Sequence, residues 1–126
     1  MIALAAAFTG CEEEQTRRIV DIMDVENRYV SFPSEGGTRT FHALEGEGFE
    51  YIVIGYDYWT SRIEYTDPDW CTVSVSGQDG AGRYTEFTVT LAPNSSTEAR
   101  SLTINVQRDS DMVVDWLDVV QSGVGD

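Results

Sequence analysis

The sequence has only two cysteines, one histidine and eight basic residues, against 22 acidic residues. Its formal net charge of −14 would repel a phosphate backbone, so nucleic-acid binding is not expected. The same charge disfavours docking on anionic lipid, and no apolar run reaches the roughly 20 residues that a membrane-spanning helix needs. Membrane association is therefore expected only through a lipid anchor.

The shortage of cysteine and histidine also limits the chemistry that the chain can perform. His42 has no histidine or thiolate near it in the sequence, so no zinc site is expected. Cys71 follows a tryptophan in a Val/Thr-rich run and is interpreted as a small buried hydrophobic residue rather than a nucleophile. Carboxylates are plentiful, but no set of nucleophile, base and orienting group can be assembled from them. The sequence therefore predicts a non-enzyme without a cofactor.

Two acidic turns make a calcium site a possible alternative. Residues 78–80 and 109–111 supply oxygen ligands, but neither has the spacing of a strong calcium-binding loop. Turn formation by short polar side chains accounts for both segments more simply. No metal ligand is assigned from the sequence.

The N-terminus changes abruptly in character at Cys11. The ten residues before it are uncharged and mostly apolar, and three glutamates follow it directly. Such a step is typical of the end of a secretory signal, and residues 8–11 resemble a bacterial lipobox. We expect residues 1–10 to be a signal-peptide remnant, residues 11–24 to be a tether and linker, and Cys11 to carry the lipid. The protein would then be exported and anchored to the outer membrane, at the cell surface. An ordinary apolar N-terminus with a single cysteine is the alternative.

The rest of the chain has the pattern of an all-β protein. Short runs of Val, Ile, Thr and aromatic residues alternate with turns rich in Gly, Pro, Asn, Asp and Ser, which is typical of a sandwich with one core. Three runs alternate strictly between apolar and polar residues, so each has one dry face. The residues predicted to lie in the core are Cys71, Val73, Val75, Phe87, Val89, Leu91, Leu102, Ile104 and Val106.

Two segments, 51–59 and 112–121, have apolar residues on both faces. A strand that is apolar on both faces can bury one face in the core and present the other as a contact surface. Aromatic rings flanked by hydrogen-bonding groups suit the C–H face of a sugar, so the predicted contact residues are Tyr56, Asp57, Tyr58 and Trp116. Burial in the core is the alternative for these rings, and it is the expected position of Trp59 and Trp70.

Several short motifs occur in an order that resembles the BACON domain, the Bacteroidetes-associated carbohydrate-binding, often N-terminal domain. The matching residues are Phe32, Glu35-Gly36-Gly37-Thr38, Trp59, Asp67, Asp69, Trp70, Val73, Gly77, Asn94, Arg100, Val119, Gln121 and Gly123. The resemblance covers about residues 25–123. It implies an immunoglobulin-like β-sandwich of about seven to eight antiparallel strands.

The resemblance also implies a function, which the fold alone does not determine. We expect a non-catalytic surface lipoprotein module that binds carbohydrate, either a host glycan such as mucin or a dietary glycan. The alternative is a protein–protein interaction or spacer module that holds partners away from the membrane, with another surface protein or a second copy of itself as partner.

Overall fold

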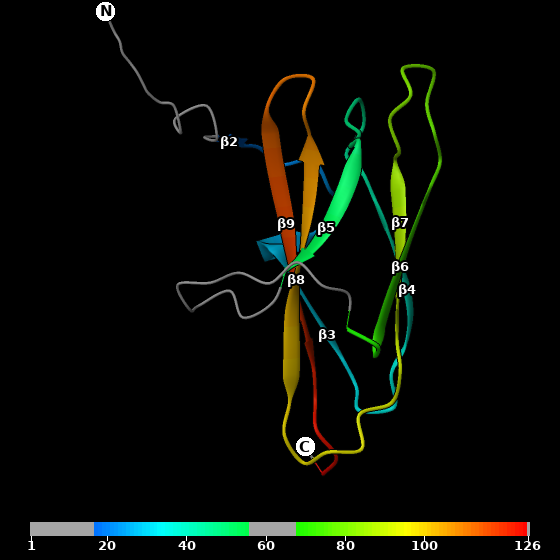
Figure 1. Ribbon diagram of the computed structural model, residues 1–126, viewed down its shortest axis with the longest axis vertical. Coiled ribbons are helices and arrows are strands. Elements are labelled where there is room, and N and C mark those ends of the chain that lie inside the picture. The colour runs from blue at the N-terminus through cyan, green and yellow to red at the C-terminus, as the bar shows by residue number, and fades with distance from the viewer. Residues whose placement is uncertain (1–16, 56–67, 126) are drawn as a thin grey trace, which may run out of the picture.

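The computed structural model describes residues 17–55 and 68–125, which form two β-sheets packed face to face (Figure 1). The larger sheet has the strand order β2 (Arg18–Ile19), β9 (Val113–Gln121), β8 (Arg100–Arg108) and β5 (Tyr51–Gly55), with β3 (Tyr29–Phe32) also paired to β9. The smaller sheet has the order β4 (Gly37–His42), β7 (Glu86–Leu91) and β6 (Cys71–Ser76). A short 3-10 turn, η2 (Glu26–Arg28), precedes β3. The predicted all-β sandwich is confirmed.

The pairing of the N-terminal strands differs from the expected antiparallel pattern. The pairs β4–β7, β6–β7, β5–β8 and β8–β9 are antiparallel. In contrast, β2 and β3 both run parallel to β9. At nine residues β9 is long enough to receive both short strands on one edge, β2 beside its start and β3 beside its end. Between these two strands, residues 20–28 have no ladder pairing with β9.

The core lies between the sheets and follows the predicted alternation closely. Phe87, Val89, Leu91, Leu102, Ile104, Val106 and Cys71 are all buried, as predicted. Val73 is half-buried and packs against the core. The prediction for Val75 is wrong, because its side chain is 38 % exposed. β6 is the edge strand of its sheet, and Val75 lines an open groove there instead of the closed core.

The folded domain starts earlier than residue 25, where the sequence placed its beginning. Ile22 is fully buried and Met23 nearly so, although both fall in the predicted linker 11–24. The reason is the carboxylate of Asp115, whose Oδ2 accepts hydrogen bonds from the Ile22 and Met23 amides at 2.8 and 2.9 Å. The Arg28 Nε donates to the Asp115 Oδ1 at 2.5 Å. We call this arrangement the Asp115 clasp; it holds residues 20–28 against β9.

The expected strand 51–59 is described only in part. β5 covers Tyr51–Gly55, and Tyr56, Asp57, Tyr58 and Trp59 lie outside the described residues. Across the two described ranges, we find no helix with the length and apolar character needed to cross a bilayer.

Candidate functional site

Trp116 lies on the outer face of the larger sheet. Along β9 the residues at 113, 115, 117, 119 and 121 are buried, so the intervening Trp116 points away from the core and is half-buried. The guanidinium of Arg28 lies 4.5 Å from the centre of the indole ring. Asp115 and Asp21 bind the same guanidinium at 2.5 and 2.9 Å. Cation–π contact therefore fixes the indole against the N-terminal segment and covers one of its faces.

Polar side chains surround Trp116 on the same face. Asn105 lies directly opposite it on β8, and Thr103 lies opposite Asp118. The Thr103 hydroxyl donates to the Asp118 carboxylate at 2.9 Å, and the Asn105 amide donates to the Val53 carbonyl at 3.3 Å. These bonds orient Asn105 beside Trp116 and fix Asp118 against the buried Thr103. The group made by Arg28, Thr103, Asn105, Trp116 and Asp118 is called the Trp116 face below.

Trp116 is the only predicted contact residue within the described ranges. Tyr56, Asp57, Tyr58 and the predicted lipid-attachment residue Cys11 lie outside them. Asp118 lies two positions after Trp116 on the same face of β9, which the period-two geometry of a strand could have indicated. Arg28 was missed because its position depends on the parallel path of the N-terminal segment along β9, which no local pattern indicates.

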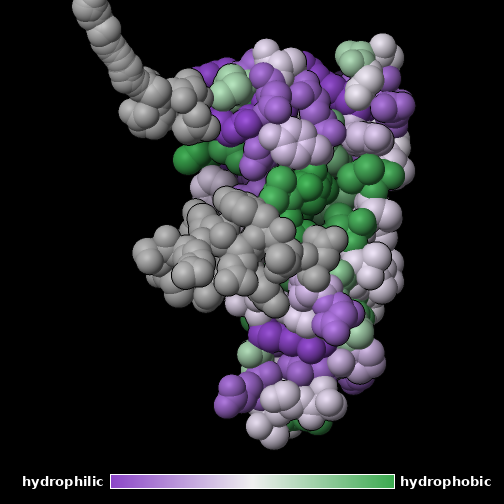
Figure 2. Space-filling view, in the orientation of Figure 1, coloured by the Kyte–Doolittle hydropathy of each residue, from purple (hydrophilic) through white to green (hydrophobic). Residues whose placement is uncertain are grey.

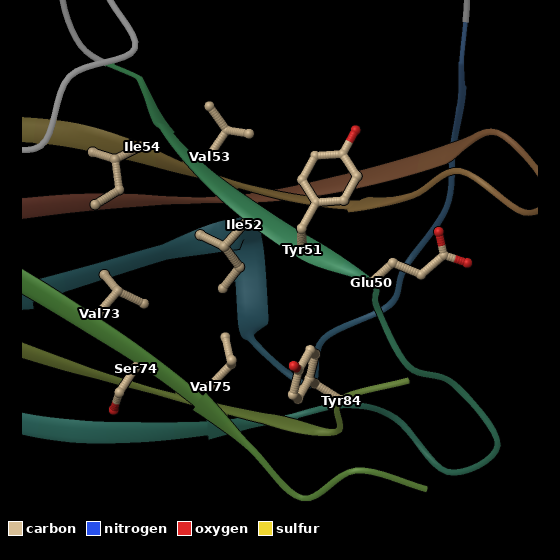
Figure 3. Close-up of a pocket in the computed structure, with 9 residues that line it drawn as sticks. All are labelled: Glu50, Tyr51, Ile52, Val53, Ile54, Val73, Ser74, Val75 and Tyr84. Atoms are coloured by element: carbon tan, nitrogen blue, oxygen red, sulfur yellow. The ribbon is translucent and has the colours of Figure 1, made fainter. Parts of the chain in front are cut away.

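A second feature is a groove between β5 and β6, with a volume of about 610 Å³. Its lining residues are Glu50, Tyr51, Ile52, Val53, Ile54, Val73, Ser74, Val75 and Tyr84. Figure 3 shows Ile52, Val73 and Val75 directed into the space between the two strands, and Tyr51, Val53 and Ser74 directed away from it. Hydrophobic residues gather on this side of the molecule in Figure 2. The floor of the groove is thus apolar.

The polar groups at one end of this groove already have partners. The Glu50 carboxylate accepts hydrogen bonds from the Asp109 amide at 2.9 Å and the Ser110 amide at 3.3 Å. Hydrogen bonds from the Ser110 side chain and the Asp109 amide lower the pKa of Glu50. The Tyr51 hydroxyl lies 2.9 Å from Gln107 Oε1 and 3.1 Å from Asp109 Oδ1. Asp109 is paired with Arg17, which also donates to the Tyr51 hydroxyl at 3.3 Å, so within the described ranges Glu50 is the carboxylate at this end without an ion pair.

The described residues support neither a reactive cysteine nor a calcium site. Cys71 pairs with Leu91 and His42 with Glu86, at opposite ends of β7, so Cys71 and His42 do not meet. The acidic turns are occupied internally: Asp79 binds the amides of Ala81 and Arg83, Asp109 pairs with Arg17, and Asp111 pairs with Arg108. No group of three or more His, Cys, Asp or Glu side chains within 17–55 and 68–125 is arranged to hold a metal ion.

Many residues that carried the family resemblance form a structural network at one end of the sandwich. Gln121 is fully buried; its amide donates to the Ala92 carbonyl at 2.9 Å and its oxygen accepts from Arg100 at 2.8 Å. The Arg100 guanidinium lies 4.4 Å from the ring centre of Trp70, which packs against the core as expected. A side chain at Gly123 would collide with the Thr97 carbonyl. The described contacts of these motif residues hold the segments at this end of the sandwich together.

Comparison with known proteins finds a family whose model matches the chain and a solved structure with a similar fold. The family model BACON, described as "Putative binding domain, N-terminal", matches residues 58–122, which is just over half of the chain. An NMR structure of a protein from Bacteroides thetaiotaomicron is similar with a TM-score of 0.55 and 18 % sequence identity, over 86 % of this chain and 92 % of that one. At this identity the likeness concerns the fold alone. No curated protein matches the chain.

Proposed function

Since this chain belongs to the BACON family of binding domains, we propose that it is a non-catalytic module that binds carbohydrate through the Trp116 face. The observation that carries the proposal is a half-buried, outward-facing indole whose orientation is fixed by Arg28. A pyranose ring presents C–H groups that can pack on an aromatic ring, while its hydroxyls need hydrogen-bonding partners.

The Trp116 face offers both kinds of contact. Trp116 and Asp118 are two positions apart on β9, so their side chains emerge about 7 Å from each other. Asn105 stands beside the indole on the neighbouring strand, and its amide is already oriented. Because Arg28 covers one face of the ring, a sugar would use the other face or the ring edge. The resulting site is shallow and suits a sugar within a longer glycan chain.

We expect Trp116→Ala to abolish glycan binding, because the ring supplies the stacking surface. Asn105→Ala should weaken binding about tenfold, the cost of roughly one hydrogen bond of 1–1.5 kcal/mol. The measurement is a screen of the full-length chain on an array of mucin-type and plant-derived glycans, followed by calorimetric titration of each variant with the best ligand.

Trp70→Ala is the matched control, because Trp70 is also half-buried beneath an arginine. It should lower the melting temperature and leave glycan affinity unchanged. The proposal fails if no glycan binds, or if both tryptophan variants bind as the unchanged protein does.

The same proposal places the module at the cell surface, tethered through Cys11. Its support is the sequence pattern of an apolar run, a lipobox-like tetrapeptide at 8–11 and an acidic segment after the cysteine. A net charge of −14 would disfavour any additional docking on anionic lipid. The acyl chains would therefore be the sole attachment, and the domain would stand off the membrane.

We expect the full-length protein, expressed in a Gram-negative host, to incorporate labelled palmitate, and Cys11→Ala to abolish the label. Cys71→Ala is the matched control, since Cys71 is the only other cysteine and is buried in the sandwich. It should label like the unchanged protein. Labelling that survives Cys11→Ala would show that Cys11 is not the attachment site.

A further inference from the structure

We propose that the groove between β5 and β6 binds an extended, basic segment of a partner protein. The segment would pair with the free edge of β6, place alternate apolar side chains on the groove floor, and bring a basic side chain next to Glu50. This site is separate from the Trp116 face and does not depend on it.

The first observation is that two sheet edges meet at this groove. β5 is the last strand of the larger sheet and β6 is the last strand of the smaller one. In the part of the chain that the structure describes, neither strand has a partner on its outer side. A free edge presents a row of backbone donors and acceptors that can pair with another chain. β6 is the more open of the two, because β5 is buried at Ile54 and Gly55 whereas β6 is exposed from Ser74 to Ser76.

The second observation is that these edges have no protection against pairing. Exposed edges usually carry lysine, other charges or proline, which discourage strand addition. β5 and β6 contain none of these, and the whole sequence contains no lysine. The opposite edge of the smaller sheet, β4, carries Arg39 and His42. Of the two edges of the smaller sheet, the one without such residues is therefore β6, which borders the groove.

The third observation is the apolar floor. Ile52 and Val73 are half-buried there, and Val75 is 38 % exposed. Figure 3 shows these side chains converging between the strands, with Tyr84 at one end. An added strand would direct every second side chain onto this floor and cover it. A segment that alternates apolar and polar residues therefore matches the groove.

Charge identifies the occupant as a basic partner. Glu50 is the one carboxylate among the lining residues, and its hydrogen bonds come from the backbone amides of Asp109 and Ser110. Within the described ranges it forms no ion pair with an arginine or histidine. A second copy of the chain would add another −14 of charge and be repelled, whereas a basic segment would be attracted.

The test uses the full-length chain and a pooled library of ten-residue peptides. Each peptide has Val, Ile or Leu at alternate positions and either arginine or glutamate at one end. We expect arginine-ended peptides to bind at least tenfold more tightly, and hydrogen exchange of the β6 amides to slow in the complex. Val75→Arg should weaken binding at least tenfold, whereas Thr40→Arg, at an exposed position on β4, should not. Trp116→Ala should also leave peptide binding unchanged.

Four results would overturn the proposal. The first is that no peptide binds at millimolar concentration. The second is that Val75→Arg, while still folded by circular dichroism, binds as the unchanged chain does. The third is that the β6 amides are already fully protected in the free protein, which would mean that the edge is covered by this chain itself. The fourth is that the chain dimerises in sedimentation and Val75→Arg makes it monomeric, which would make a second copy the occupant.

Discussion

Replacement of Asp115 by alanine should cost about 3–5 kcal/mol of unfolding free energy, because two buried amides lose their acceptor, at about 1–3 kcal/mol each, and Arg28 loses a half-buried ion pair. Asp115 is 2 % exposed, and its carboxylate binds Arg28 and the amides of Ile22 and Met23. Alanine would leave the two buried amides without an acceptor, whereas the partly exposed Arg28 would keep its bond to Asp21. Small domains are stable by only about 5–15 kcal/mol, so this single change removes a large share.

Urea denaturation of the full-length chain measures this loss, and Asp118→Ala is the matched control. Asp118 lies on the same strand but on the outer face, half-buried, with one hydrogen bond from Thr103. Its replacement should cost no more than about 1 kcal/mol. Equal losses in the two variants would show that the Asp115 clasp does not stabilise the fold. The clasp also fixes Arg28 above Trp116, so we expect Asp115→Ala to weaken glycan binding as well.

Replacement of Phe87 by alanine should cost a similar amount, about 3–5 kcal/mol, which is typical of large-to-small changes in a core. Phe87 is fully buried at the second position of β7. Its ring lies 5.4 Å from that of Phe41 and 6.0 Å from that of Phe49, measured between ring centres. Removing it would open a cavity in an aromatic cluster that joins β7, β4 and the segment before β5.

Thr88→Ala tests whether the effect belongs to the buried face. Thr88 follows Phe87 on the same strand, points outward, and shares a 2.9 Å hydrogen bond with Thr40 at the surface. The Thr88→Ala replacement should lower the unfolding free energy by less than about 1 kcal/mol. Differential scanning calorimetry of both variants would check the contrast. Equal melting temperatures for the Phe87→Ala and Thr88→Ala variants would contradict this prediction, because they would show that the aromatic cluster is not the core.

The strands that sequence predicted well are those with strict alternation and two neighbours. In β7 and β8 each apolar residue predicted to be inward is buried, because a central strand has one face against the opposite sheet. The same pattern failed at Val75, since alternation reports which face a residue is on and not whether that face is covered at an edge.

The last strand was harder to interpret for a different reason. Burial alternates strictly along β9, but two of its buried positions are Asp115 and Gln121. Their polar groups bind the backbone of distant segments, so they look like surface residues in the sequence. A buried polar residue with long-range partners cannot be told from an exposed one by local pattern. This also concealed the start of the domain, which depends on the Asp115 clasp.

The parallel placement of β2 and β3 beside β9 has a consequence for the order of folding. In the described chain β9 is the only strand partner of both, although about 90 residues separate them in sequence. The ribosome makes β9 last among the described strands, so β2 and β3 have no strand to pair with until β9 has been made. The larger sheet therefore assembles only after β9 has been made, and a chain truncated before residue 113 loses the partner of three strands at once.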